Sequence, residues 1–201
     1  MLTLRSSPSS PFARKVRIAM DMLGLTDQIT IEPADTLDPK DSVRKQNPLG
    51  KIPTLILENG TTLFDSAVIL EYLDDRAGGG RILPKLGADR FEALRMQALA
   101  DGIMDAGILR VYEGRFRPAE KHEAKWIDHQ TDKITRTLAA LESSPPVFKK
   151  TLNVGDITLA CALGYLDFRF QGLWRKDYPN LVNWLNEFAA KVPSFKTTTP
   201  Q

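Results

Sequence analysis

Three consecutive glycines, Gly78 to Gly80, divide the sequence into two parts with different hydrophobic patterns. Glycine is common at helix ends and in linkers because it adopts backbone conformations that other residues avoid. Before the glycines, short apolar segments typical of strands alternate with helical ones, whereas only helical periodicity follows them. A chain of 201 residues can form two small domains that share an interface. We therefore predict a first domain at 1–77, a linker at 78–86 and a second domain at 87–201.

The first part is predicted to be an α/β domain with a mixed four-stranded sheet. Its opening strand, helix and second strand imply a right-handed parallel crossover. Farther along, Asn59-Gly60 predicts a tight antiparallel hairpin between the last two strands. We expect strands at 2–4, 28–32, 54–57 and 61–64, and helices at 12–25, within 35–46 and at 65–76.

The second part is predicted to be all-helical. Its apolar residues recur at three- and four-residue spacing, and prolines and serines separate the periodic segments. The fold class is therefore an α/β domain followed by an all-α domain. We expect the main helices at about 91–116, 127–141, 159–170 and 181–192.

Charge and hydropathy exclude two classes of partner. The net charge is only +2, and basic residues are interspersed with acidic ones, so the basic face typical of nucleic-acid binding is not expected. No apolar run approaches the roughly 20 residues of a membrane-spanning helix. The N-terminus also lacks the apolar core of a signal peptide. We therefore expect a cytoplasmic protein without a nucleic-acid or membrane partner.

The scarcity of cysteine and histidine argues against a disulfide or a metal site. The single cysteine, Cys161, cannot form an intramolecular disulfide, which suits a reducing compartment. His122 and His129 do not combine with it at a metal-ligand spacing. A buried, small apolar role is the strongly favoured interpretation of Cys161.

A pair of serines precedes the first predicted helix, which begins at Pro11. Proline is favoured at the first helical position, and the free N–H groups there stabilise a nearby anion. Ser10 can donate a hydrogen bond to a thiolate held at this place, or it can simply cap the helix. Locally the cap is the favoured interpretation, and the two roles are compatible.

Two further segments offer groups that suit a peptide-like ligand. Pro53 directly precedes an apolar strand, and a cis bond there would turn the backbone of Ile52 outward to pair with an extended ligand. Asp65 and Ser66 begin a helix, where Ser66 suits a carboxylate and Asp65 an ammonium group. A plain strand entry and a second helix cap are the competing interpretations.

The order and spacing of these segments resemble the glutathione S-transferase family. The resemblance rests on residues 10–17, 47–55 and 63–73, and on residues 152–163 in the helical part, so it spans essentially the whole chain. It implies a thioredoxin-like first domain that binds glutathione as co-substrate without a metal. It also implies that the second domain supplies much of the pocket for an electrophile, and that the protein is a homodimer.

The resemblance also implies roles for individual residues. Ser10 matches the catalytic position of serine- and cysteine-type members, with Ser7 and Ser9 as alternatives in the same loop. Because serine replaces the cysteine of thiol-transferases, that activity is disfavoured. The residues expected to bind glutathione are Phe12, Lys51, Ile52, Pro53, Asp65 and Ser66.

The expected activity is glutathione transfer to a small apolar electrophile. A glutathione-dependent lyase, dehalogenase or isomerase, a non-catalytic ligand-binding protein and an interaction module are the alternatives. Candidate residues of the electrophile pocket are Phe12, Met104, Arg110 and Tyr112, although core packing explains most of them equally well.

One departure from the family pattern is Cys161, three residues after Thr158, where an Asp would complete a helix capping box.

Overall fold

A mixed four-stranded sheet forms the centre of the first part in the computed structural model, which describes residues 1–200. The strand order is β2-β1-β3-β4, with β1 parallel to β2 and antiparallel to β3, and β3 antiparallel to β4. This topology confirms the predicted crossover and hairpin. The strands are β1 (Leu2–Ser6), β2 (Ile29–Pro33), β3 (Thr54–Ile56) and β4 (Thr62–Leu63).

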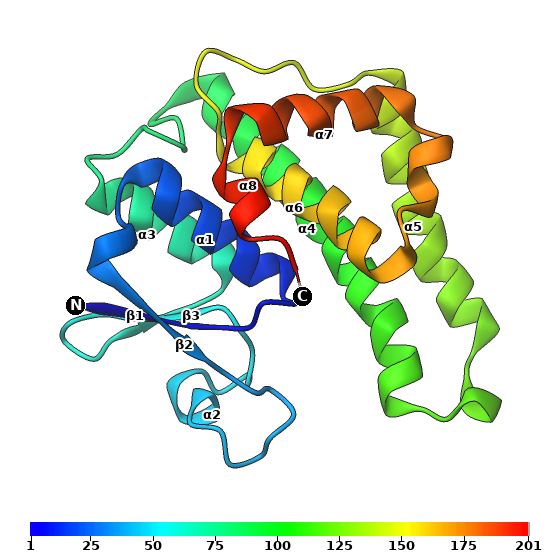
Figure 1. Ribbon diagram of the computed structural model, residues 1–201, viewed down its shortest axis with the longest axis horizontal. Helices are drawn as coiled ribbons and strands as arrows, with labels where there is room; N and C mark the ends of the chain where they lie inside the picture. The colour runs from blue at the N-terminus through cyan, green and yellow to red at the C-terminus, as the bar shows by residue number, and fades with distance from the viewer. Residues whose placement is uncertain (201) are drawn as a thin grey trace.

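Two helices cover one side of this sheet, and a short helix lies on the other side (Figure 1). The sheet contributes Leu4 and Leu55, which are register partners on neighbouring strands and are both fully buried. Burying such side chains between sheet and helices is the main favourable contribution to folding. The helices are α1 (Pro11–Leu23), the 3-10 helix η1 (Thr26–Gln28), α2 (Val43–Gln46) and α3 (Ser66–Arg76).

The second part contains only helices within the described residues, as predicted. The longest helix, α4, runs beside α6 over much of its length (Figure 1). The residues of α6 from Val154 to Leu166 are all buried, because α4 and α1 both pack against this helix. The elements are α4 (Gly87–Phe116), η2 (Ala119–Lys121), α5 (Ala124–Ser143), α6 (Val154–Phe170), η3 (Leu173–Lys176), α7 (Pro179–Lys191) and α8 (Ser194–Thr197).

The start of α6 corrects the prediction of an incomplete capping box. The helix begins at Val154 rather than near Thr158, and Asn153 is its N-cap. The Asn153 side chain accepts from the N–H of Gly155 at 2.8 Å, and Asp156 accepts from the N–H of Asn153 at 2.9 Å. The box is therefore complete. Cys161 lies in the helix interior, where burial raises its thiol pKa to about 11.

Arg14 joins α1 to the helical part of the molecule. Its Nη2 donates to the carbonyl of Phe195 at 2.6 Å, and its guanidinium lies 4.1 Å from the centroid of the Phe195 ring. The guanidinium passes so close to Gly164 of α6 that a Cβ there would lie 2.5 Å from Nη1. The absence of a side chain at Gly164 therefore allows this contact. Gln201, the last residue of the expected second domain, lies outside the described residues.

Candidate functional site

A cavity of about 700 Å³ opens between the sheet domain and the helices α4 and α6. Its walls come from the start of α1, the segment after β2, the segment before β3 and one face of each of the two helices. Four residues predicted for the site line it: Ser10, Phe12, Lys51 and Ile52. The other three, Pro53, Asp65 and Ser66, do not line it.

Ser10 is both the N-cap of α1 and part of the cavity wall. Its Oγ accepts from the N–H of Ala13 at 3.2 Å. A serine hydroxyl also has one proton to donate, so acceptance at the cap leaves that proton for a ligand. Ser7 and Ser9 line the same cavity, with their Oγ atoms 3.2 Å apart. The cavity therefore has a hydroxyl-rich wall at the positive end of a helix dipole.

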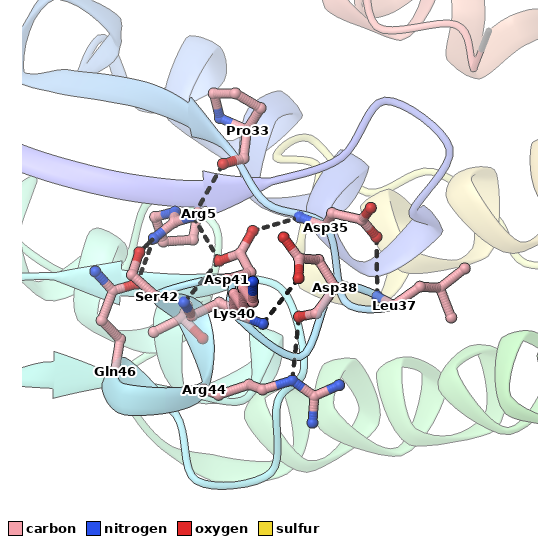
Figure 2. A network of polar contacts seen from close by, with 12 residues as sticks. Arg5, Pro33, Asp35, Leu37, Asp38, Lys40, Asp41, Ser42, Arg44 and Gln46 are labelled. Carbon is pink, nitrogen blue, oxygen red and sulfur yellow. Dashed lines mark hydrogen bonds and ion pairs between the residues drawn. The ribbon is translucent and has the colours of Figure 1, made fainter.

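A network of polar contacts around Arg5 positions the segment after β2 (Figure 2). Arg5 lies on β1 and is buried, and its guanidinium donates to Asp41 at 2.9 Å and to the carbonyl of Pro33 at 3.0 Å. The Asp41 carboxylate also accepts from the N–H groups of Asp35 and Val43, both at 2.7 Å. These donors lower the pKa of Asp41. Residues 34–37, which line the cavity, are thereby tied to the central strand.

The segment before β3 presents Lys51 and Ile52 to the cavity. The carbonyl of Lys51 accepts from Asn47 Nδ2 and from Thr54 Oγ1, each at 3.0 Å, which holds the turn in place. The peptide bond between Ile52 and Pro53 is cis, and Pro53 is buried. Strand pairing begins only at Thr54, so Ile52 precedes the sheet ladder.

Asp65 and Ser66 form the start of α3, as predicted. Asp65 is the N-cap, and its Oδ1 accepts from the N–H of Ala67 at 2.9 Å. Ser66 is the first residue of the helix and is buried. Burial, and to a smaller extent the charge of Asp65, raises the pKa of Asp105, which does line the cavity.

Two carboxylates of α4 face the sheet domain. Asp101 accepts from the fully buried ammonium of Lys15 at 2.7 Å. Burial raises the pKa of Asp101, and Lys15 opposes the shift. Burial also raises the pKa of Asp105, with Lys51 and Lys15 opposing it. This end of the cavity therefore combines ammonium and carboxylate groups, which can match a zwitterionic ligand.

The helical wall includes residues that sequence reasoning missed, among them Asp105, Arg115, Tyr165 and Arg169. The first two lie on the same helix as the predicted Tyr112, which lines the cavity as expected. The seven- and three-residue spacings between Asp105, Tyr112 and Arg115 fit one face of a helix, and this spacing is the sequence pattern that could have identified Asp105 and Arg115.

Two of the candidate pocket residues, Met104 and Arg110, do not line the cavity. Met104 is fully buried in the core, because the side of α4 that it occupies packs against the rest of the bundle. Arg110 does not line the cavity, and its guanidinium instead lies 4.2 Å from the centroid of the Phe170 ring. Burial lowers the pKa of Arg110.

Comparison with family models and with known proteins identifies the family to which this chain belongs. The model of the glutathione S-transferase N-terminal domain matches residues 9–76, and that of the C-terminal domain matches residues 124–187. YibF of Escherichia coli K12, named an uncharacterized GST-like protein, is 36% identical over 204 residues that span all of both chains. The chain belongs to the glutathione S-transferase family.

Solved structures of other glutathione S-transferase family members agree in fold over the whole chain. A family member from Pseudomonas fluorescens Pf-5 with bound glutathione is 42% identical, covers 100% of both chains and superposes with a TM-score of 0.91. A second structure from that organism contains S-(propanoic acid)-glutathione, at the same identity and coverage and with a TM-score of 0.88. The fold of this glutathione S-transferase family member is therefore the predicted thioredoxin-like domain followed by a helical domain.

Proposed function

We propose that this protein binds glutathione in the cavity and activates its thiol for attack on an electrophile. The observation that carries this proposal is that Ser10 and the adjacent pair Lys51 and Ile52, which come from two separate segments, line one cavity at the start of α1. Relatives that span the whole chain hold glutathione and a glutathione S-conjugate, which supports a site for both co-substrate and product. No metal takes part in this proposal.

Each part of glutathione has a matching group in this arrangement. Ser10 donates to the thiolate, and the backbone of Ile52 pairs with the extended tripeptide, next to the buried Pro53. Asp65 and Ser66, at the start of α3 and outside the cavity lining, bind the γ-glutamyl ammonium and carboxylate of a ligand that extends beyond the cavity. Lys51 attracts a carboxylate of the ligand. Phe12 contributes an apolar surface beside the sulfur.

Ser10 and the start of α1 can together supply the free energy needed to activate the thiol. A free thiol has a pKa of about 8.5, and lowering it by about two units requires about 2.7 kcal/mol of preference for the thiolate. One charge-assisted hydrogen bond contributes about 1.5–3 kcal/mol, and a helix start contributes about 0.3–1 kcal/mol. Ser10 and the start of α1 together are sufficient. The thiolate then forms a bond to the electrophilic carbon, and a leaving group such as chloride departs with its electron pair.

The test is the pH dependence of conjugation with a chlorodinitrobenzene in wild type and in Ser10→Ala. We expect the variant to bind glutathione with similar affinity but to shift the rate profile to higher pH by about one to two units. Ser7→Ala and Ser9→Ala are matched controls in the same loop and should leave the profile in place. If Ser10→Ala kept the wild-type profile and Ser7→Ala or Ser9→Ala lost it, the thiol would lie beside another hydroxyl.

The same experiment separates the alternative functions. A lyase, dehalogenase or isomerase would use the same activated thiol but act on a different electrophile. A binding protein without turnover would bind glutathione and give no conjugate with any member of an electrophile panel.

We further propose that the protein acts as a homodimer in the cytoplasm, as the family resemblance implies. Support for an interface comes from exposed apolar side chains at α3 and the start of α4, among them Val68 and Phe91. An ion pair between Glu71 and Arg90 joins the two elements at this surface. No helix within residues 1–200 has the length and hydropathy needed to cross a bilayer.

A further inference from the structure

The far end of the cavity carries two tyrosine–arginine pairs on facing helices. Tyr112 and Arg115 lie three residues apart on α4, and Tyr165 and Arg169 lie four residues apart on α6. Residues at these spacings share one face of a helix. Because α4 and α6 run side by side, both pairs line the same cavity (Figure 1).

Each arginine lies near the ring of its tyrosine. The Arg115 guanidinium lies 5.3 Å from the centroid of the Tyr112 ring, and the Arg169 guanidinium lies 5.9 Å from that of Tyr165. Burial raises the pKa of the Tyr165 hydroxyl, and the charges of both Arg169 and Arg115 oppose that shift. Both guanidiniums are therefore within electrostatic reach of one buried phenol.

Neither arginine has a carboxylate partner within residues 1–200, whereas several other arginines do. The Nε of Arg169 is buried and has no hydrogen-bond partner among the described atoms. A buried donor without a partner is costly, and an ordinary arginine on the surface would be solvated instead. Arg169 therefore lines the cavity with its positive charge unpaired among the described residues, so an anionic ligand could supply the missing partner.

The charges are separated along α4. Asp101 and Asp105 lie in the middle of α4, near Lys15 and Lys51. Arg115 lies ten residues after Asp105, which places it about 15 Å farther along the helix at 1.5 Å per residue. Arg115 is therefore remote from the two aspartates, and a carboxylate bound there avoids repulsion from them.

We propose that the electrophile carries a carboxylate, which Arg115 and Arg169 bind while Tyr112 and Tyr165 contact its carbon skeleton. This inference rests on the proposed function, and it replaces the expectation of a purely apolar electrophile. Guanidinium groups suit carboxylates because their donors form two parallel hydrogen bonds. The tyrosine rings supply flat apolar surface, and the Tyr165 hydroxyl supplies one further donor.

The test compares glutathione S-conjugates that differ only in charge. Calorimetry would measure the affinities of S-carboxymethyl- and S-(para-carboxybenzyl)-glutathione against their carbamoyl counterparts, which have nearly the same shape. For at least one spacer length, the carboxylate should bind about tenfold more tightly than the amide, as one charge-assisted hydrogen bond predicts. Equal affinities within both pairs would overturn the proposal.

Variants assign that preference to the two arginines. Arg169→Gln should abolish the carboxylate preference and leave the affinity for glutathione itself unchanged, and Arg169→Lys should restore part of it. Arg115→Gln tests the same subsite at a more exposed position if the first variant does not fold. Arg136→Gln, on the exposed surface of α5, removes the same charge and should have no effect.

Two outcomes distinguish failures of the two proposals. If wild-type protein does not bind glutathione, the proposed function fails together with this inference. If glutathione binds but Arg169→Gln and Arg115→Gln weaken it as much as they weaken the carboxylate conjugates, the arginines hold the tripeptide. In that case the inference alone is overturned.

Discussion

The side chain of Lys15 on α1 is fully buried, and its ammonium forms an ion pair with Asp101 of α4. A buried ion pair is weak evidence for stability compared with an apolar pair, because both charges lose their hydration. Breaking one side of it is costly, since the remaining charge is left buried. The pair therefore fixes the position of α1 relative to α4 more than it adds net stability.

The residue-scale prediction concerns this pair. Asp101→Asn leaves the Lys15 ammonium without its counter-charge, so the free energy of unfolding should fall by about 3 kcal/mol. Urea denaturation would measure the change. Asp132→Asn removes one partner of the exposed ion pair with Arg136 and should change the free energy of unfolding by less than about 0.5 kcal/mol. Equal effects of the two substitutions would contradict the account of Lys15.

At the scale of elements, α6 begins with a complete capping box, and its residues from Val154 to Leu166 are all buried. Removing the cap should therefore lower the stability of the whole protein rather than only fray the end of the helix. Asn153→Ala removes an acceptor for the N–H groups of Gly155 and Asp156 and should cost about 1–2 kcal/mol of stability. Thermal or urea unfolding measures it. Asn186→Ala, at an exposed position of α7, is the control and should be neutral or slightly stabilising.

The segment between β2 and α2 provides a prediction about pH. The pKa of Asp41 is lowered in the folded protein, chiefly by the N–H groups of Val43 and Asp35 and then by Arg5. A carboxyl group with a lowered pKa stabilises the fold at pH values above its unfolded pKa of about 3.9, and this contribution is lost as the pH falls through the folded pKa. The midpoint temperature of Asp41→Asn should therefore lie below that of wild type at pH 7.

That difference should shrink as the pH is lowered below about 4, where wild type also loses the charge. Asp27→Asn, at an exposed position in η1, is the control and should track wild type across the range. If the midpoint temperatures of Asp41→Asn and wild type differed by the same amount at every pH, the lower stability of the variant would come from the changed shape of the side chain and not from the lost charge.

At the scale of the whole molecule, the exposed side chains of Val68 and Phe91 bear on the proposed homodimer. Phe91 is 71% exposed beside the Glu71–Arg90 ion pair that joins α3 to α4, so covering it with a second copy of the chain would remove a large apolar surface from water. Phe91→Arg should convert the dimer to a monomer in sedimentation velocity. Leu173→Arg, at a similarly exposed position on η3, should leave the dimer intact. A wild-type protein that sediments as a monomer would rule out the dimer.

The architecture could be predicted from the sequence because its signals are local. The Asn59-Gly60 turn, the glycine run and the periodic apolar residues each specify an element without reference to distant contacts. The start of α6 was misplaced because its true cap, Asn153, lies in a segment whose apolar residues show no helical face. A helix buried on all sides has no polar face to mark its register.

The site could be predicted only in part, for a similar reason. Ser10, Phe12, Lys51 and Ile52 belong to short motifs around helix and strand starts, where residue type and position carry the information. Tyr165 and Arg169 meet the cavity only because α6 packs against α4, and no local pattern reports that contact. Tertiary packing therefore decides which residues form the helical wall of the cavity.

Calorimetric titration of the purified protein with glutathione tests the central claim most directly. Wild type should bind with saturation, and Ser10→Ala should bind with similar affinity. Ser66→Ala should bind about tenfold more weakly, as the loss of one charge-assisted hydrogen bond predicts. Absence of saturable binding to wild type, or equal affinity of Ser66→Ala and wild type, would contradict a glutathione site formed by the starts of α1 and α3.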